Sequence, residues 1–366
     1  MTDTNAAAHV LTSLDALGGW PGVLTRLVDG ANLSAEEAAT AMGAILTGNA
    51  TPAQLIAFTV ALRIKGETAD ELSGMLGAVL GAAEVVPLSD EVRATAVDIV
   101  GTGGDRSHSV NVSTMAALVV AGAGVPVCKH GNRGASSQCG TADVLEELGV
   151  AIELTPQGVA DCIAEAGIGF CFAPRFHPAF RFAGPARREV GIPLAFNLLG
   201  PMANPGRVQR QLIGVADVRF AERMLGALRA HGSTDAWVVN GGGLDELTTT
   251  GPSTVLSITD GGEPRSFIVD PAELGLAITT KERLVGGDRT GNAHAVRRVV
   301  AGDHGPHRDI VVLNAAAGLV VAGVATSMVH GVELAASSID SGRAAATLDA
   351  FVVASQSAAS RDALLA

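Results

Sequence analysis

The sequence predicts an α/β fold, in which a large domain with a mostly parallel central sheet flanked by helices is joined to a small all-helical domain. Helical patterns alone occupy the first ninety or so residues, and from about residue 94 onward short β-rich runs alternate with helical ones. The chain is 48% hydrophobic but only 3% aromatic, as in helices packed on a buried parallel sheet of small aliphatic residues. Its 366 residues fit two domains, or one large domain with an appendage.

Three helix starts in series identify the helical part. Segments 34–37, 51–54 and 68–71 each place Ser or Thr three residues before Glu or Gln, which is the capping-box pattern. Apolar residues follow the first and third boxes at helical spacing. The second has Pro52 at the first helical position, and its helix, through Ile64, is apolar on most sides. We expect this second helix to be buried.

The remainder of the chain reads as alternating strands and helices. Expected strands are 95–100, 125–129, 168–172, 211–215 and 236–240, and expected helices include 111–121 and 142–148. In such sheets ligands bind where the strands end and the loops begin. Polar and glycine-rich segments at these strand ends are therefore the candidates for a functional site.

Composition disfavours several classes of function. The net charge is −12, and no run of Lys or Arg is longer than Arg187–Arg188 or Arg297–Arg298, so nucleic acid is not an expected partner. The longest apolar stretch, 115–128, is too short and too interrupted by Gly to cross a membrane. Residues 1–9 have neither the basic nor the apolar part of a signal peptide. Together with four cysteines in no CxxC pair, these features indicate a cytoplasmic protein with reduced, buried thiols.

The strongest motif is Gly-Thr-Gly-Gly-Asp at 101–105, which follows a strand and precedes Asn-Val-Ser-Thr at 111–114, where a helix opens. The glycines let the backbone approach a ligand closely, and the helix start adds N–H donors, so together they predict a phosphate cradle. An ordinary Gly-rich turn is the alternative for the first motif alone. Arg106 excludes a dinucleotide fingerprint, and the Gly-Lys-Ser/Thr of a P-loop is missing.

A second motif, Lys-His-Gly-Asn-Arg at 129–133, is expected directly after the next strand. Lys129 could pair with phosphate, while His130, Asn132 and Arg133 offer donors for a carboxylate or an amine. Standing alone, this motif would favour a solvated surface loop. Its position one strand along from the glycine-rich loop favours a shared site.

Two further motifs add charge at later strand ends. Asp245 and Glu246 follow Gly243 and a strand, and adjacent carboxylates are ligands that Mg²⁺ takes alongside substrate phosphates. An acidic helix start is an equally good interpretation of this pair alone. Arg187 and Arg188 are expected in a turn, where one could bind a carboxylate while the other is solvated.

At these residues the sequence resembles the anthranilate phosphoribosyltransferase family of tryptophan biosynthesis, over nearly the whole chain. The motifs that carry the resemblance are GTGGD at 101–105, NVST at 111–114, KHGNR at 129–133, FAPRFHP at 172–178, RRE at 187–189, NLLGPMANP at 197–205, GLDELT at 243–248 and VVLNAAAG at 311–318. The resemblance implies transfer of phosphoribosyl from 5-phosphoribosyl-1-pyrophosphate (PRPP) to the amine of anthranilate. It also implies two Mg²⁺ per active site, and a homodimer built on the helical domain.

The resemblance further implies which residues act. The PRPP-binding residues would be Gly101, Gly103, Gly104, Asp105, Ser109, Asn111, Ser113, Thr114, Lys129 and Cys139. The anthranilate-binding residues would be Gly101, His130, Asn132 and Arg187, with His130 and Arg187 as the catalytic pair. The metal ligands would be Ser113, Asp245 and Glu246. The helical domain would comprise 1–90, joined in space by helices around 175–192, and the PRPP-binding domain 91–366.

The chain departs from the family pattern at three places. Segment 106–109 replaces a Gly-containing stretch that ends in Thr, although Ser109 keeps the hydroxyl. Cys139 stands where Ser is usual, and Ala203 where Thr is common. Three alternatives stay open: a pyrimidine nucleoside phosphorylase, a binding protein that keeps the fold without catalysis, and a phosphoribosyltransferase for another aromatic acid.

Overall fold

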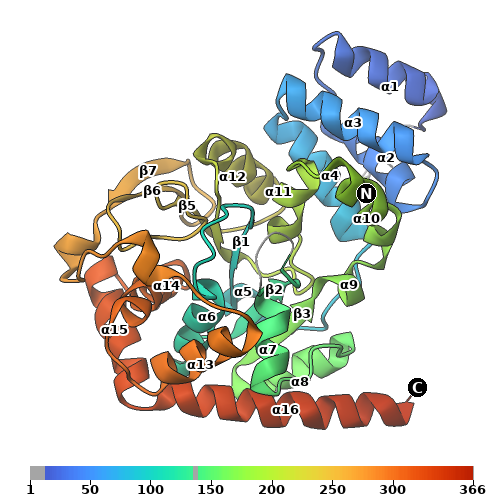
Figure 1. Cartoon of the computed structure of the whole chain (residues 1–366). Helices are drawn as coiled ribbons and strands as arrows, with labels where there is room; N and C mark the ends of the chain where they lie inside the picture. Colours follow the sequence, from blue (N-terminus) through green and yellow to red (C-terminus); the bar gives the residue numbers. More distant parts are fainter. Residues whose placement is uncertain (1–12, 135–138, 366) are drawn as a thin grey trace, which may run out of the picture.

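The computed structural model describes residues 13–134 and 139–365, so the expectation on segment 1–9 falls outside the described residues. A bundle of short helices lies to one side of a larger body built on a central sheet, and the last helix runs along the base of that body (Figure 1). The predicted fold class, an α/β domain with a mostly parallel sheet plus a helical bundle, is confirmed.

Helices α1 to α4 form the bundle. Their bounds are Gly19–Val28, Ala35–Leu46, Pro52–Lys65 and Ala69–Gly81. All three predicted capping boxes are present, each with both of its reciprocal hydrogen bonds. The expectation that α3 is buried on most sides is wrong, because it buries one stripe around Phe58 and leaves the Ile64 side chain 82% exposed.

The central sheet has seven strands in the order β3-β2-β1-β4-β5-β6-β7. Strands β3, β2, β1, β4 and β5 are parallel, and β6 and β7 continue the sheet in antiparallel pairing. The bounds are Val97–Gly101 (β1), Val127–Gly131 (β2), Ile168–Phe172 (β3), Arg210–Gly214 (β4), Asp235–Asn240 (β5), Ser253–Ile258 (β6) and Arg265–Val269 (β7).

Successive strand residues pack into two different cores. Val97 and Ile99 of β1 belong to a core shared with α6 and α14, whereas Val100 belongs to a core shared with the helical bundle, α11 and α12. The helices beyond the bundle are α5 (Asp90–Thr95), α6 (Val112–Gly122), α7 (Thr141–Leu148), α8 (Pro156–Ala166), α9 (Ala173–Phe176), α10 (Gly184–Val190), α11 (Ala195–Met202), α12 (Ala221–Ala230), α13 (Arg289–Val300), α14 (Pro306–Val321), α15 (Met328–Asp340) and α16 (Arg343–Leu365).

Two predicted strands begin two residues later than expected. The first begins at Val97 and not at residue 95, because Thr95 ends the short helix α5. The second begins at Val127 and runs to Gly131, so Lys129 and His130 lie inside the strand and not in the loop after it. Both side chains are buried, at 1% and 3% exposure. Such burial of polar groups requires partners on each side of the sheet.

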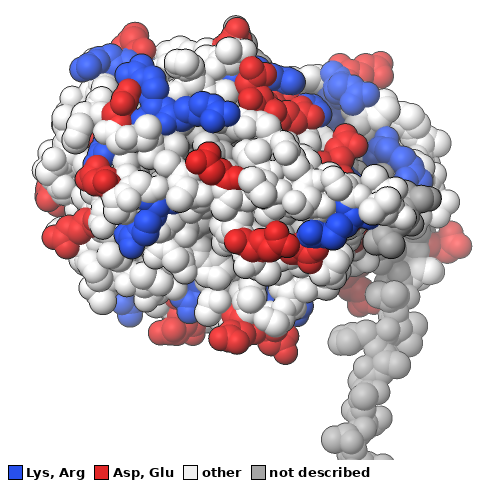
Figure 2. Space-filling model, turned by 90° about the horizontal axis from the view of Figure 1, so that it is seen from below, with Lys and Arg blue, Asp and Glu red and all other residues white. Residues whose placement is uncertain are grey.

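Surface charge, cysteines and helix hydrophobicity are the remaining general features of the fold. Acidic and basic side chains lie beside one another across the face viewed from below (Figure 2). All four cysteines are buried, and none forms a disulfide. Within the described residues, every helix is too short or too polar to cross a membrane.

Candidate active site

The predicted functional residues gather at the carboxyl edge of the sheet, around the end of β1. This strand is the first along the chain. Strands β2 and β3 are added on one side of it, and the chain then returns to add β4 and β5 on the other side. A crevice at such a switch in strand order is where open α/β sheets bind ligands. The glycine-rich loop leaves β1 at Gly101, and the acidic motif follows β5 one strand beyond β4.

The glycine-rich loop and the acidic loop are in direct contact. The Gly103 N–H donates to Oδ2 of Asp245 at 2.7 Å. A Cβ atom on Gly101 would collide with the Asp245 carboxylate, and one on Gly214 would collide with the Asp245 backbone. Gly103 has a φ of 67°, which favours glycine. These small residues are therefore needed for the two loops to pack together.

The acidic loop is held from both sides. Oδ1 of Asn240 accepts from the Gly243 N–H at 3.2 Å, at the start of the loop. Asn314 of α14 closes its end, because its side chain donates to the Leu247 carbonyl at 2.8 Å and accepts from the Leu247 N–H at 3.0 Å. Sequence reasoning placed Asn314 in a family motif but gave it no role. The structure shows that it fixes the residue directly after Glu246.

Three carboxylates at this edge disfavour one another's charge. Burial, and then the charge of Asp105, raises the pKa of Asp245 to about 7. Burial, and then Asp245, raises the pKa of Glu246 well above its usual value. Oδ2 of Asp105 is buried without a hydrogen-bond partner. A cation bound here would relieve this repulsion, so the residues fit a divalent metal.

The described residues contain no group of three or more His, Cys, Asp or Glu side chains arranged to hold a metal ion by themselves. Mg²⁺ commonly binds through one or two carboxylates and completes its shell with water and substrate phosphates. Asp245 and Glu246 therefore suit an ion that arrives together with a phosphorylated substrate. They do not suit a permanent structural metal.

Lys129 joins the strand to the start of α6. Its Nζ donates to the Ile99 carbonyl, and also to Oγ of Ser113 at 3.3 Å. Burial lowers the pKa of Lys129, and the nearby Asp98 opposes that shift. Beside it, Oδ1 of Asn111 is buried with no hydrogen-bond partner. The buried cation at the N-terminus of α6 makes this a suitable place for an anion, and the Asn111 oxygen can accept from a hydroxyl donor.

His130 is neutral, with one ring nitrogen unused. Burial, and then the neighbouring His177, holds the pKa of His130 well below its ordinary value. Its Nδ1 lies 3.0 Å from the Gly200 carbonyl. A carbonyl only accepts, so we assign the ring proton to Nδ1. Nε2 is therefore an acceptor, and it is buried without a partner.

A line of ring contacts connects His130 with Arg187. The rings of His130 and His177 lie 5.0 Å apart, His177 and Phe180 lie 5.3 Å apart, and Phe180 meets Phe196 edge-on at 5.7 Å. The Arg187 guanidinium lies 4.8 Å from the centre of the Phe196 ring. Sequence reasoning did not single out these rings, although His177 lies in a quoted family motif.

Arg187 and Arg188 lie in helix α10, and the expectation of a turn there is wrong. Arg188 is exposed, whereas Arg187 is half-buried. Burial alone lowers the pKa of Arg187 to about 10. Every ion pair found among the described residues involves other side chains. Arg187 is therefore a partly desolvated cation without a protein carboxylate beside it.

The other predicted residues have local partners. Oγ1 of Thr114 donates to Thr141 of α7 at 3.3 Å, and Oγ of Ser109 accepts from Ser107 at 3.1 Å. The Cys139 carbonyl accepts from the Asn111 amide at 3.4 Å, which places Cys139 beside the phosphate cradle. Asn132 is exposed, and its Oδ1 accepts from the next backbone N–H at 2.7 Å.

Arg133 is not available to a substrate in this structure. Its guanidinium lies 3.1 Å from the Asp143 carboxylate and 2.5 Å from that of Glu146. These pairs hold its pKa above the ordinary value for arginine. Arg133 therefore joins the motif to α7 and does not offer a free cation, contrary to what the sequence alone allowed.

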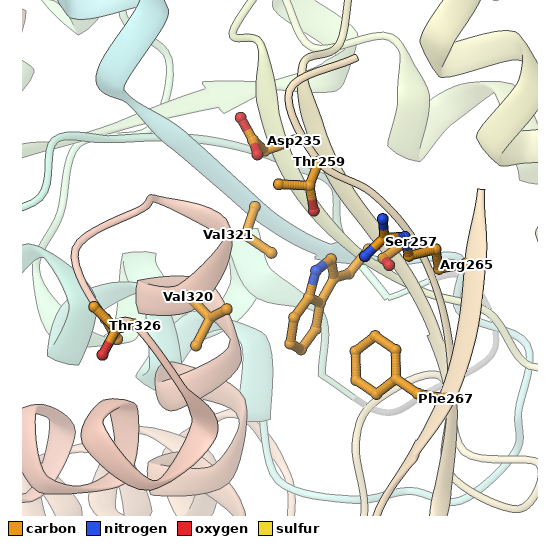
Figure 3. A pocket seen from close by; sticks show the side chains of 10 residues that line it. Asp235, Ser257, Thr259, Arg265, Phe267, Val320, Val321 and Thr326 are labelled. Atoms are coloured by element: carbon orange, nitrogen blue, oxygen red, sulfur yellow. The ribbon is translucent and has the colours of Figure 1, made fainter. Parts of the chain in front are cut away.

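A separate cavity of about 380 Å³ lies at the other end of β5. Asp235, Ser257 and Arg265 come from the sheet side, and Val320, Val321 and Thr326 from the end of α14 and the segment after it (Figure 3). Asp235 begins β5, whereas the acidic loop follows its last residue. None of the predicted site residues lines this cavity.

Comparison with known proteins agrees with this arrangement. The model of the "Glycosyl transferase family, helical bundle domain" matches residues 21–83, and that of the "Glycosyl transferase family, a/b domain" matches residues 93–345. The anthranilate phosphoribosyltransferase of Salinispora arenicola is 51% identical over 338 residues, covering 91% of this chain and 96% of the relative.

Solved structures give the same result. The anthranilate phosphoribosyltransferase of Thermus thermophilus has a TM-score of 0.85 and 39% identity, covering 91% of this chain and 99% of the other. The enzyme of Saccharomyces cerevisiae in complex with PRPP and Mg has a TM-score of 0.84 and 27% identity, covering 92% and 98%. That yeast enzyme has also been solved with 4-fluoroanthranilate. The chain therefore belongs to the anthranilate phosphoribosyltransferase family, whose members join an N-terminal helical bundle to an α/β domain.

Proposed function

We propose that this site carries out the family's reaction, in which the anthranilate amine displaces pyrophosphate from C1 of PRPP. The products are N-(5-phosphoribosyl)anthranilate and pyrophosphate, in the second step of tryptophan synthesis from chorismate. The observation that carries the proposal is that two groups of charged side chains lack a partner of opposite charge in the protein. Crowded carboxylates lie beside a phosphate cradle, and a cation without a counter-ion lies at the end of the ring contacts from His130.

The donor half of the site would hold PRPP. Gly101, Gly103 and Gly104 would let the backbone approach PRPP closely. The start of α6 and Lys129 would supply the positive character that the leaving pyrophosphate needs. Asp105, Ser109, Asn111, Ser113, Thr114 and Cys139 complete the proposed PRPP set. A transition state with positive charge on the sugar and growing negative charge on pyrophosphate would be stabilised most by the groups around the leaving group.

Asp245 and Glu246 would hold Mg²⁺, and a second ion would lie near the Ser113 hydroxyl. When bound, the metal supplies charge neutralisation at the phosphate oxygens. The raised pKa values of both carboxylates support this assignment, because they describe a site that gains stability when a cation arrives. Two ions per site remains our proposal.

The acceptor half would hold anthranilate. Arg187 would pair with its carboxylate, and Gly101 and Asn132 complete the set with His130. Nε2 of His130 can accept a hydrogen bond from the amine, which is already neutral at pH 7 and needs no strong base before attack. Orientation of two bound reactants can supply roughly 7–11 kcal/mol. Attack from this side would invert C1, giving a β-linked product from an α-linked donor.

We also propose how the chain divides into domains, how it assembles and where in the cell it acts. The helical domain would comprise 1–90, with the helices around 175–192, and the PRPP-binding domain 91–366. Packing of α10 against α3 supports that grouping. A homodimer through the helical bundle would have twice the 36.9 kDa of one chain, which sedimentation would measure. We further propose a cytoplasmic location and small-molecule substrates, with neither nucleic acid nor membrane as a partner.

The decisive experiment follows anthranilate fluorescence with purified protein, PRPP and MgCl₂. We expect steady loss of fluorescence that needs all three components and stops with EDTA. No loss with folded protein would reject anthranilate as acceptor, and release of pyrophosphate with other aromatic acids would then identify a recruited relative. Phosphorolysis of a pyrimidine nucleoside that continues in EDTA would instead indicate the phosphorylase alternative.

A further inference from the structure

The central sheet is open between β1 and β2 at the edge where the site lies. Strands β1 and β4 pair over five residues, and so do β2 and β3, but β1 and β2 pair only at Val97 and Val127. The Val97 N–H donates to the Pro126 carbonyl at 3.0 Å. In a parallel ladder with this register, Ile99 would next bond the Cys128 carbonyl and the His130 N–H.

Side chains take the places of those missing ladder bonds. Oδ1 of Asp98 accepts from the His130 N–H at 3.1 Å, and Nδ2 of Asn204 donates to the Cys128 carbonyl at 2.7 Å. The Ile99 carbonyl accepts from Nζ of Lys129. Three of the four backbone groups that would have joined the strands are therefore satisfied by side chains.

The two inserted residues also bind each other. Nδ2 of Asn204 donates to Oδ2 of Asp98 at 2.8 Å, and Oδ1 of Asn204 accepts from the Gly206 N–H at 2.8 Å. Asp98 is fully buried and Asn204 is 2% exposed. A buried carboxylate costs free energy unless it is paired, and Asp98 faces the charge of Lys129. The pair is thus fixed in place by its own hydrogen bonds and by α11, which precedes Asn204.

Beside the opening, two consecutive residues of β2 lie on opposite faces of the sheet, as neighbours in a strand do. Lys129 points to the start of α6, where its Nζ meets Ser113. His130 points to the other face, where its ring meets the Gly200 carbonyl and His177. The backbone position of β2 thus determines where Lys129 lies in the PRPP half of the site and where His130 lies in the anthranilate half.

We propose that the Asp98–Asn204 pair is a positioning device that holds β1 and β2 apart and thereby places Lys129 and His130 together. The substrates named in this inference rest on the proposed function, whereas the arrangement of the two strands does not depend on it. It assigns to neither residue a contact with substrate. Loss of the pair should disturb both halves of the site at once, whereas loss of a group that contacts one substrate should disturb one half.

The test compares Asp98→Asn with Asn204→Ser. Asp98→Asn keeps the shape but removes the charge and turns a donor toward the Asn204 amide, and Asn204→Ser removes the donor to Cys128. We expect each variant to raise the KM of both PRPP and anthranilate at least fivefold and to lower kcat at least tenfold. Lys129→Ala should raise mainly the PRPP KM, and Arg187→Ala mainly that of anthranilate.

Ser233→Ala is the matched control, because its hydroxyl donates to Gln211 at 2.8 Å in an equally buried pair at the amino edge of the sheet. It should lower Tm while leaving both KM values within twofold. KM values within twofold in Asp98→Asn or Asn204→Ser, or a change confined to one substrate, would overturn the inference. If Asp98→Asn does not fold, Asn204→Ser decides the matter.

Two readouts do not depend on turnover. Calorimetric titration with PRPP and MgCl₂ should give at least fivefold weaker binding in both variants. Amide hydrogen exchange of segment 127–131 should be at least fivefold faster than in wild type, and Ser233→Ala should leave it unchanged. A wild-type protein that fails to consume anthranilate would count against the proposed function alone, and these two readouts would still support or overturn the inference about the pair.

Discussion

Arg187 illustrates how a single residue can indicate its ligand. The guanidinium rests on the Phe196 ring, and burial lowers its pKa to about 10 without a carboxylate to offset the cost. Desolvation of the guanidinium destabilises the folded protein, and an anion that binds beside it would offset this cost. Its neighbour Arg188 is exposed and has the same charge, so the two form a natural pair for comparison.

We predict that Arg187→Ala weakens anthranilate binding by about 2–5 kcal/mol, the usual cost of truncating one member of a buried charge pair. PRPP binding should change little, because Arg187 lies in the acceptor half. Titration of anthranilate in the presence of PRPP would measure the effect. Arg188→Ala should behave as wild type, and a change within about twofold in Arg187→Ala would remove the assigned role.

For Asp245 and Glu246 we predict two opposite effects of mutation, a loss of activity and a gain in stability. Asp245→Asn combined with Glu246→Gln should abolish Mg²⁺ dependence and most turnover. The same change should raise the Tm of the metal-free protein, because both carboxylates have raised pKa values and their charge opposes folding. Calorimetry would measure the Tm of the metal-free protein, and an activity assay would measure the Mg²⁺-dependent turnover. The exposed pair Asp260→Asn with Glu263→Gln should change neither property, and wild-type rates in the double variant would place the metal elsewhere.

At the scale of elements, the close approach of β4 to the acidic loop is a packing requirement. A Cβ on Gly214 would collide with the Asp245 backbone. We therefore predict that Gly214→Ala displaces the loop and weakens Mg²⁺-dependent PRPP binding at least tenfold, which calorimetry would measure. Gly43→Ala is the control, because Gly43 lies in α2 with nothing within 4 Å of the added Cβ. It should stabilise the protein by up to about 1 kcal/mol, and equal effects would contradict the steric argument.

Several elements could be predicted from the sequence because their signals are local. The capping boxes at Ser34, Thr51 and Thr68 satisfy backbone groups within one turn, and each starts a helix as expected. Strands β6 and β7 escaped prediction because neither forms a fully buried apolar run. Arg265, Ser266 and Ile268 of β7 are exposed.

Tertiary partners explain the main error in the site. Lys129 and His130 have polar side chains, which favoured a loop, but the structure buries them in β2. Their partners Ser113, Asp98 and Gly200 lie 16, 32 and 70 positions away in the chain, so no local pattern could reveal them. The identities of the candidate residues were predictable from the motifs, whereas the network that supports them was not.

For the whole molecule, the two buried histidines predict acid sensitivity. Burial lowers the pKa of His177 to about 4, compared with 6.5 for an ordinary histidine. Between these values the unfolded chain binds a proton that the folded chain does not, so the free energy of unfolding falls as pH drops from 6.5 towards 4. His177 alone should account for about 3 kcal/mol, since one pKa unit corresponds to about 1.4 kcal/mol.

Urea unfolding at pH 7 and pH 5 would measure this dependence. We expect His177→Gln to have a shallower slope with pH than wild type, while His294→Gln, at an exposed position of α13, keeps the wild-type slope. An unchanged slope in His177→Gln would show that other groups take up the protons. The measurement is made without substrates, so it is independent of the proposed activity.

The gap between β1 and β2 also has a consequence for how the enzyme could be redesigned. In a continuous sheet the spacing of neighbouring strands is fixed by the backbone, and no substitution adjusts it. Here two side chains determine part of that spacing, so it can be altered by mutation. Libraries that vary positions 98 and 204 would therefore change the separation between the PRPP and anthranilate sites. Mutagenesis of the residues that contact the substrates would not change this separation.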